Sequence, residues 1–372
     1  MNNKDPTVAV VTLTLSNSGF IPLTNLIKVL IPLSKELHVL TGSIPPNFFE
    51  KSFNIYFHET NHKPGKNFLS RAFYNFYSQL VYSWNIIKLL NKVDTFIFFI
   101  GADLLIIPLF ILKIFRKKTF LFFAGDPIKS SRAKKDKMVF IQSILSKISC
   151  KLSDKIIVYS DNMISEGGLT TYSDKIIVTN IHFLDFKKFK ITKEYKNRKQ
   201  CVGFVGRLSE EKGIINFMDA LIEISKNNNI KFIIIGEGPL EKEIKNKINN
   251  HNLNEHVHLV GWIPHEELPR YLNEIKLLVL PSYTEGLPKI ILESMACGTP
   301  VLSTSVGAIS DIVRDERNGF IMENNAASSI TKNSKRALEH PKIDMVIENA
   351  QSFVKAEFNY NMVVTRWEKI FK

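Results

Sequence analysis

Two glutamates eight positions apart, Glu285 and Glu293, stand in the segment SYTEGLPKIILESMACGTPV, residues 282–301. Another segment, GRLSEEKG, carries the cations Arg207 and Lys212, five residues apart. A guanidinium forks onto phosphate oxygens, and an ammonium supplies a compact positive charge. Two such cations in one glycine-containing loop suit a diphosphate. The two carboxylates are either ordinary surface charges or two ends of one ligand site.

The predicted geometry separates the two carboxylates. Pro288 suits the first turn of a helix and Gly298 the position just past its end. Glu285 then lies in the preceding loop, and Glu293 lies roughly 12 Å further along by helix rise. This spacing suits opposite ends of an extended ligand better than an acid/base pair. On helical periodicity alone, Glu293 is predicted to be a surface residue.

Several glycine loops follow predicted strands in the second half of the chain. Glycine lets the backbone approach a ligand closely, and a helix N-terminus after such a loop favours an anion. Each loop is weak as a single pattern, because surface loops with these residues are common. The loop residues of interest are Gly206 and Gly213, then Gly236 and Gly238, then Gly261, Trp262 and Pro264 before a helix starting near His265.

Short apolar runs alternate with longer amphipathic segments throughout the chain, a pattern typical of parallel sheets covered on both faces. The polar, basic segment 186–200 separates two such series and is predicted to be a linker. We therefore expect two doubly wound α/β domains, with ligands outside the carboxyl ends of their strands and a cleft between them. The predicted strands are 7–13, 37–42, 53–57, 95–100, 119–125, 155–160, 175–180, 201–206, 230–236, 257–261, 275–282 and 300–305.

Length and composition agree with two folded domains. The chain has 372 residues, of which 45% are hydrophobic and 23% charged. Its three cysteines, Cys150, Cys201 and Cys297, are widely spaced and predict free thiols in a reducing compartment. The first residues are typical of a strand and not of a signal peptide, so a cytoplasmic location is expected.

The first half of the chain contains two strongly apolar segments. Residues 95–115 resemble a membrane span, but Asp103 and Pro108 interrupt them, which favours a strand followed by a buried helix. Residues 70–90 are rich in aromatic side chains at helical spacing. That spacing predicts a packed core face, more readily than an aromatic cofactor site, formed by Phe73, Phe76, Tyr77, Leu80, Val81, Trp84 and Ile87.

Positive charge is concentrated in the first 200 residues, which hold 29 Lys and Arg against 14 Asp and Glu. Segment 113–137 alone has nine basic and two acidic residues. This asymmetry indicates an anionic partner, such as a membrane surface, a phosphorylated acceptor or nucleic acid. The alternative is a solvated basic face. No recognised RNA-binding motif accompanies it, so nucleic acid is not expected.

The motifs of the second half, taken together, resemble those of a known family. EGLPKIILE resembles the E-x7-E signature of retaining glycosyltransferases with the GT-B fold, especially glycosyltransferase family 4. GRLSEEKG, IIIGEGP and VHLVGWIPHEEL resemble its other donor-domain blocks, in the expected order across roughly 200–322. The resemblance implies two Rossmann-like domains facing across a cleft. An acceptor-binding domain would span 1–190 and a donor-binding domain 200–355, with a final helix, about 356–372, packing back on the first.

The resemblance also implies roles for individual residues. Glu285 would contact the donor sugar, Glu293 the ribose hydroxyls, and Arg207 and Lys212 the departing diphosphate. The chain has no D-x-D motif, in agreement with a donor site that needs no metal or other cofactor. The remaining donor-binding residues would be Gly206, the backbone of Gly286, Leu287 and Pro288, and Ile263 beside the base.

Three segments depart from the family pattern. GAISD stands where two glycines and a glutamate are common, so Gly307 is kept but Ala308 and Asp311 differ. Ala308 is expected to restrict the backbone near the phosphate. A single glycine, Gly19, follows the first strand where two are usual. Asp126 stands near the position of a frequent histidine. It would contact donor sugar or acceptor, or simply belong to an ordinary Asp-Pro turn.

These observations predict a metal-independent retaining hexosyltransferase at the cytoplasmic face of a membrane. Its donor would be a UDP- or GDP-sugar, and its acceptor a lipid-linked or polysaccharide precursor. The basic first half would meet an anionic membrane surface. The alternatives are a sugar-nucleotide epimerase or hydrolase of the same fold, or a non-catalytic nucleotide-sugar-binding or RNA-binding protein.

Overall fold

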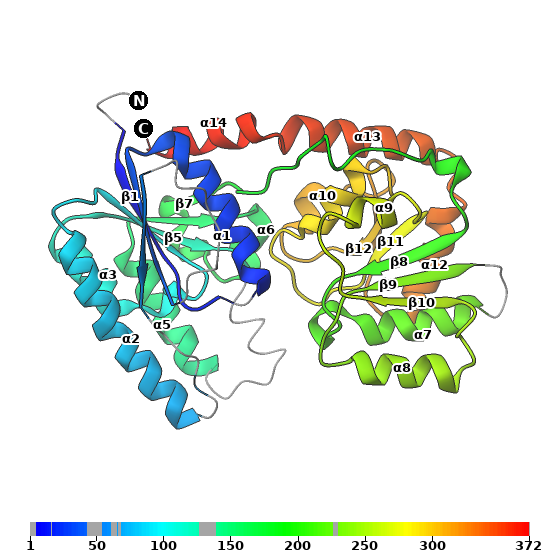
Figure 1. Ribbon diagram of the computed structural model, residues 1–372, viewed down its shortest axis with the longest axis horizontal. Coiled ribbons are helices and arrows are strands. Elements are labelled where there is room, and N and C mark those ends of the chain that lie inside the picture. Colours follow the sequence, from blue (N-terminus) through cyan, green and yellow to red (C-terminus); the bar gives the residue numbers. More distant parts are fainter. Residues whose placement is uncertain are drawn as a thin grey trace. The chain divides into compact units, whose positions relative to one another are not determined.

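The computed structural model describes residues 5–15, 17–42, 54–60, 65, 68–125, 139–225 and 230–371. The chain divides into two compact units, one of residues 1–183 with 360–372 and the other of residues 184–359 (Figure 1). Each unit is a parallel sheet with helices on both faces, so the predicted doubly wound α/β fold is confirmed.

The first unit contains a seven-stranded parallel sheet in the order β3-β2-β1-β4-β5-β6-β7. The order reverses between β1 and β4, which makes that pair the switch point of the sheet. Central strands β1 and β4 are wholly buried, as their continuous apolar sequences require. The strands are β1 (Thr7–Val11), β2 (Glu36–Thr41), β3 (Ile55–Glu59), β4 (Thr95–Phe99), β5 (Lys118–Phe123), β6 (Lys155–Val158) and β7 (Ile176–Val178).

Helices cover both faces of this sheet. Right-handed crossovers place α2, α3 and α5 on one face and α1 on the other, where it contacts α14. The C-terminal helix α14 thus belongs to the first unit, and its buried Trp367 donates from Nε1 to the Asn180 carbonyl at 2.8 Å. The helices are α1 (Asn17–Leu30), η1 (Ile31–Leu33), α2 (Phe68–Leu89), η2 (Ala102–Leu104), α3 (Ile106–Ile114), α5 (Val139–Leu152), α6 (Asp161–Glu166), η3 (Thr170–Lys175) and α14 (Tyr360–Phe371).

The predicted core face of α2 is wrong. The aromatic stripe from Phe73 to Ile87 faces solvent, except Val81, which is half-buried. The buried stripe is instead Ser78, Tyr82, Ile86 and Leu89, and the Tyr82 hydroxyl donates to the Thr12 carbonyl at 2.7 Å. Periodicity failed here because α2 carries two apolar stripes and cannot by itself show which one faces the sheet.

Helix α3 differs from its prediction in the same way. The expected strand and helix within 95–115 are present as β4 and α3. The helix buries Pro108, Leu109 and Leu112 but exposes Ile107 and Phe110 on its other side. No helix in the described part of the chain is long and apolar enough to cross a membrane.

The second unit contains a six-stranded parallel sheet in the order β10-β9-β8-β11-β12-β13, with its switch point between β8 and β11. Its strands are β8 (Cys201–Val205), β9 (Lys231–Ile235), β10 (Val257–Gly261), β11 (Leu277–Leu280), β12 (Val301–Thr304) and β13 (Phe320–Met322). Its helices are η4 (Tyr195–Asn197), η5 (Glu210–Lys212), α7 (Ile214–Ser225), α8 (Glu241–Asn250), α9 (Leu268–Leu272), α10 (Lys289–Ala296), α11 (Ile309–Ile312), α12 (Ala327–Leu338) and α13 (Ile343–Glu357).

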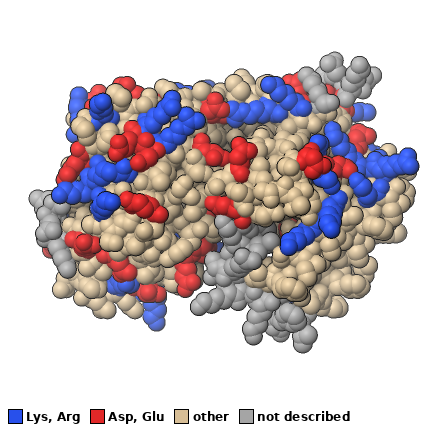
Figure 2. All heavy atoms as spheres, turned by 180° about the vertical axis from the view of Figure 1, so that it is seen from behind, with Lys and Arg blue, Asp and Glu red and all other residues tan. Residues whose placement is uncertain are grey.

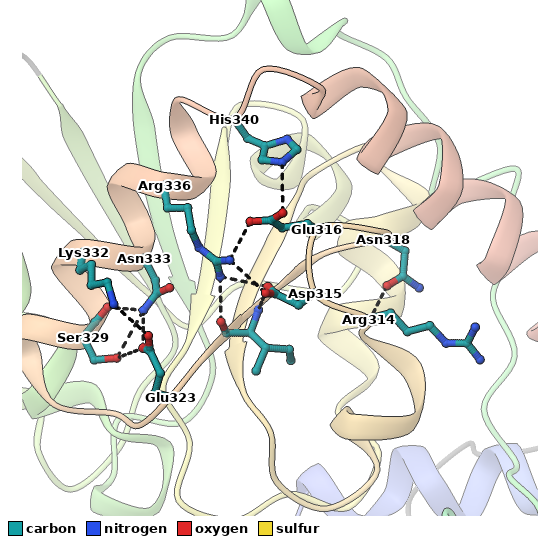
Figure 3. A network of polar contacts seen from close by, with 11 residues as sticks. Arg314, Asp315, Glu316, Asn318, Glu323, Ser329, Lys332, Asn333, Arg336 and His340 are labelled. Atoms are coloured by element: carbon teal, nitrogen blue, oxygen red, sulfur yellow. Dashed lines mark hydrogen bonds and ion pairs between the residues drawn. The ribbon is translucent and has the colours of Figure 1, made fainter.

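Strand β13 has no counterpart among the predicted strands because it is only three residues long. Side chains of α12 fix it in place (Figure 3). The Arg336 guanidinium donates to Asp315, Glu316 and the Ile321 carbonyl within 3.0 Å. Hydrogen bonds to Asp315 raise the pKa of Arg336, so this cation stays charged. Long-range polar contacts thus replace the hydrophobic pattern that a longer strand would show.

Segment 186–200, predicted to be a linker, is instead part of the second unit. Arg198 is buried there and donates to the carbonyls of Ile275 and Cys297 and to the Thr299 hydroxyl, within 3.0 Å. Burial lowers the pKa of Arg198, and these acceptors compensate for the lost hydration. The sequence of this basic segment does not show which of its arginines and lysines is buried and which are solvated.

The three cysteines are free, as predicted. Cys150, Cys201 and Cys297 are buried. Burial raises the pKa of each thiol to about 12, so none carries the thiolate needed for nucleophilic reaction near neutral pH.

Asp103 gives a testable pH dependence of stability. Its carboxyl is wholly buried in η2, and burial raises its pKa from 3.8 to about 6. Its protonation therefore favours the folded state at low pH, and this contribution is lost as pH rises through about 4 to 6. We expect Asp103→Asn to stabilise the protein at pH 8 by up to about 3 kcal/mol. Thermal melting should show this gain shrinking toward pH 4.

Asp154→Asn is the matched control with the opposite sign. Although burial raises its pKa, hydrogen bonds from Lys113 and Thr119 lower it overall. This substitution should destabilise the protein at pH 8 and have less effect in acid. A gain for Asp103→Asn that is independent of pH would contradict the assignment.

Candidate active site

Lys212 and Glu285 meet at the switch point of the second sheet. β8 and β11 are neighbours there, and their following loops carry Lys212 and Glu285. Lys212 Nζ lies 2.6 Å from Glu285 Oε1, and the Ser282 hydroxyl donates to the same oxygen at 2.7 Å. The Glu285 side chain is only 6% exposed. Ligands of doubly wound sheets bind outside the carboxyl ends of the strands at this position.

The backbones of these two loops are in direct contact. The Tyr283 N–H donates to the Glu211 carbonyl at 2.9 Å. Gly213 has a φ of +68°, and a β-carbon there would lie 2.0 Å from the Pro281 carbonyl oxygen. Glycine is therefore required both by the left-handed backbone and by the close approach.

The loop after β12 holds the Glu285 loop from the other side. Gly307 has a φ of +57°, and a β-carbon there would lie 2.0 Å from the Glu285 carbonyl oxygen. The Ala308 N–H donates to the Gly286 carbonyl at 2.9 Å, and the Thr304 hydroxyl donates to the Ser282 carbonyl at 2.6 Å. Ala308 itself has a φ of −79°, so alanine fits this position without backbone strain.

Glu293 is buried on α10, so its predicted surface position is wrong. Its side chain is 4% exposed, and His265 Nε2 lies 2.7 Å from its Oε1. Lys289 Nζ lies 3.5 Å from the same oxygen. Periodicity failed because every α10 residue from 291 to 296 is buried, which leaves no polar face in that part of the helix.

His265 connects Glu293 to the segment that was predicted to be a linker. Lys188 Nζ lies 3.3 Å from His265 Nδ1. An ammonium can only donate, so Nδ1 accepts and Nε2 carries the proton that is donated to Glu293. The imidazole also packs against Phe189, with ring centroids 5.2 Å apart. The orientation of the His265 ring is thereby fixed from both sides.

Glu285 and Glu293 therefore have separate partners, as expected for two binding points and not for an acid/base pair. Lys212 and Ser282 hold the first carboxylate, and His265 and Lys289 hold the second. Sequence reasoning did not assign roles to Ser282, His265 or Lys289. The only signal for His265 was its place directly after the glycine loop at 261–264.

Arg207 offers a more accessible cation in the same region. Its side chain is 60% exposed, and its guanidinium lies 4.0 Å from Glu211. It follows Gly206, whose carbonyl oxygen would be 1.9 Å from a β-carbon at Gly236. The exposed guanidinium is thus free to reorient onto a ligand, while the backbone that carries it is held.

Backbone donors lie near Glu285 at the start of α10. Pro288, which was predicted to lie in the first turn of this helix, is instead its N-cap, one position earlier. No side chain caps the helix, so its first N–H groups remain suited to an anion. Leu287 and Pro288 are buried and Gly286 is half-buried. Residues 286–288 can therefore present backbone and not side-chain groups to a ligand.

The remaining predicted residues lie at other strand ends. Ile263 is half-buried in the loop after β10, beside Trp262, whose ring is exposed. In the first unit, Gly19 lies in α1, directly after the switch-point strand β1. Asp126 lies outside the described residues. Among the described residues, no group of three or more His, Cys, Asp or Glu could hold a metal ion.

Comparisons with known proteins place this site in a family context. Residues 185–353 match the model of the family described as glycosyl transferases group 1. An uncharacterised glycosyltransferase of Methanocaldococcus jannaschii is 28% identical over 55% of this chain and 60% of its own length. An Escherichia coli protein, UDP-Gal:alpha-D-GlcNAc-diphosphoundecaprenol alpha-1,3-galactosyltransferase, is 31% identical over 45% of this chain and 43% of its own. The alignment thus spans about 60% of the length of the first curated relatives.

Solved structures resemble the whole chain in fold. Anabaena Alr3699/HepE in complex with UDP covers 98% of this chain and 99% of its own, with a TM-score of 0.75 at 15% identity. Sucrose-phosphate synthase of Thermosynechococcus elongatus covers 98% of both, with a TM-score of 0.77 at 17% identity. Identities this low establish the two-domain fold alone.

The close approach at Gly307 gives a prediction for the loop that carries Glu285. Gly307→Ala should destabilise the second unit and displace that loop, because its β-carbon would collide with a backbone oxygen. We expect a loss of roughly 2–4 kcal/mol, from backbone strain plus the collision. Thermal melting and UDP titration by calorimetry would measure both effects.

Gly168→Ala is the matched control. Gly168 has a similar φ of +64°, but a β-carbon there would meet nothing within 4 Å. It should show only the backbone strain, about 1 kcal/mol, and unchanged UDP binding. Equal effects of the two substitutions would contradict the proposed contact between Gly307 and the Glu285 loop.

Proposed function

We propose that this chain, whose residues 185–353 match the model of the glycosyl transferases group 1 family, is a retaining glycosyltransferase of family 4. Its donor would be a UDP- or GDP-sugar bound at the carboxyl edge of the second sheet. The observation that supports this most strongly is the contact of Lys212 with Glu285 across the switch point, beside the exposed Arg207. Under this proposal, the Glu285 carboxylate would bind sugar hydroxyls, and the two cations would bind the diphosphate.

The reaction breaks the bond between the anomeric carbon and the diphosphate oxygen. Negative charge then develops on the diphosphate, and Arg207 and Lys212 would stabilise it more in the transition state than in the ground state. The acceptor hydroxyl would attack from the face that the diphosphate leaves. Its proton would pass to the leaving phosphate oxygen, so no separate protein base is needed and the anomeric configuration is retained.

The two glutamates would position the donor. Glu285 would accept hydrogen bonds from sugar hydroxyls while Lys212 and Ser282 hold its carboxylate in place. Glu293, held by His265, would accept hydrogen bonds from the ribose. The base would lie along Ile263 and Trp262. Because two side-chain cations and the α10 N-terminus would together neutralise the diphosphate, we propose that transfer needs no metal ion or other cofactor.

The acceptor is proposed from the charge of the first half and from the relatives. One relative's name specifies a diphosphoundecaprenol-linked acceptor, and another's specifies amylovoran biosynthesis. We propose a lipid-linked or polysaccharide-precursor acceptor bound by the first unit, with Gly19 and Asp126 on that side. The protein would act in the cytoplasm at an anionic membrane surface.

Donor turnover tests the proposed activity. The purified chain should release nucleoside diphosphate from at least one UDP- or GDP-sugar when membrane extract supplies acceptors. Added chelator should leave this rate unchanged. Release at the same rate without extract would indicate a hydrolase, whereas conversion of the donor to its epimer without release would indicate an epimerase. A folded sample that turns over no donor in the panel would overturn the proposal.

Substitutions separate the proposed roles. Arg207→Ala and Lys212→Ala should each lower kcat by about 10²–10³-fold, because they remove charge stabilisation that is strongest in the transition state. Glu293→Gln should mainly raise KM, since ribose contacts are equal in both states. Lys332→Ala, an exposed lysine on α12, is the control and should leave both constants unchanged. A kcat effect confined to Glu293→Gln would contradict the assignment.

A further inference from the structure

An apolar surface covers one side of the first unit, where the sequence predicted packed core. It is formed by the outward sides of α2, α3 and α5, which contact one another in the order α2-α3-α5. We propose that this apolar face is a docking surface for an anionic lipid bilayer. The inference goes beyond the donor chemistry, because it rests on none of the residues of the second unit.

Helix α2 contributes the longest part of the apolar face. Its exposed side chains recur at helical spacing, and Phe73 and Trp84 are 65% and 61% exposed. Single exposed apolar residues are ordinary, but a continuous stripe of them on a water-soluble surface is costly unless something covers it. Six residues make up the stripe: Phe73, Phe76, Tyr77, Leu80, Trp84 and Ile87.

Helices α3 and α5 extend the apolar face sideways. On α3, Phe110 and Ile114 are exposed on the side away from the sheet. On α5, Phe140 is 74% exposed, and its neighbours continue the same stripe. The full set on these two helices is Ile107, Phe110, Ile114, Phe140, Ile141, Ile144 and Ile148. Three adjacent helices thus present one kind of surface.

The three helices of the apolar face carry charges of one sign, although Lys113 on α3 pairs with Asp154, which follows α5. The sequences of α2, α3 and α5 contain no Asp or Glu, and they contain five Lys or Arg. Lys88 at the end of α2 lies 4.9 Å from the Trp84 ring centre, so a cation borders the aromatic stripe directly. The lower right of Figure 2, which views the first unit from behind, shows uncharged surface bordered by Lys and Arg.

This combination fits a bilayer better than a second copy of the chain. Aromatic and aliphatic side chains enter the boundary between headgroups and acyl chains, while Lys and Arg meet anionic headgroups. Trp and Tyr, both present on α2, are the residues that favour this boundary. A symmetric dimer through the same face would instead bring the cations of two copies onto one interface.

Vesicle binding by the full chain tests the surface without any sugar nucleotide. The chain should cosediment with vesicles of equimolar phosphatidylglycerol and phosphatidylcholine, and much less with phosphatidylcholine alone. High salt should weaken binding, because it screens the cations. The double substitution Phe76→Asp with Trp84→Asp should lower binding at least about tenfold. Met345→Asp, an exposed apolar site on α13, should leave it unchanged.

Tryptophan fluorescence locates the contact. Lipids brominated in their acyl chains should quench the emission of the bound protein. Trp84→Phe should remove this quenching, whereas Trp262→Phe, which removes the exposed tryptophan of the second unit, should retain it. Quenching that survives Trp84→Phe would overturn the proposal. Absent vesicle binding together with concentration-dependent dimerisation, lost in the double substitution, would assign the face to a second copy.

UDP titration keeps the two proposals distinguishable. The double-substituted chain should bind the preferred nucleotide, UDP or GDP, as the unsubstituted chain does, because α2 lies outside the second unit. Vesicle binding without any nucleotide-sugar turnover would retain the docking surface and reject the enzyme. Turnover without vesicle binding would do the reverse.

Discussion

The contact between Lys212 and Glu285 is the constraint on which the candidate site depends. It joins the loops that follow two neighbouring strands of the sheet. The two residues in contact lie 73 positions apart in the chain. Removing one partner of a buried ion pair typically costs about 3–5 kcal/mol, because the other charge is left without compensation. The glycines at 213 and 307 permit this contact, since their missing β-carbons allow three strand-end loops to touch through their backbones.

Much of this architecture could be predicted from local sequence. All twelve predicted strands appear, because buried parallel strands are nearly continuous apolar runs. The placement of Glu285 in a loop and Glu293 on the following helix could be predicted as well, since Pro288 and Gly298 mark the two ends of that helix. These features depend on residues that are close in sequence.

The features that sequence reasoning missed all depend on contacts between distant residues. The surface prediction for Glu293 failed because its partner, His265, comes from another strand-end loop. The pattern of segment 186–200 predicts a linker because it does not reveal that Arg198 donates to three acceptors between residues 275 and 299. Helix α2 has two apolar stripes, and only its tertiary contacts determine which one is buried.

The two units share a sheet topology but differ in the chemistry of their side chains. Each sheet reverses its strand order once, between β1 and β4 or between β8 and β11. Around the reversal between β8 and β11, charged side chains pair with one another. The backbones of the loops also approach so closely there that only glycine fits. The first unit instead places its distinctive residues on the outer side of α2, α3 and α5, away from the sheet. A sheet edge can bind a small polar ligand, whereas an apolar helix layer requires an extended partner. This difference in chemistry is why the donor was assigned to one unit and the lipid surface to the other.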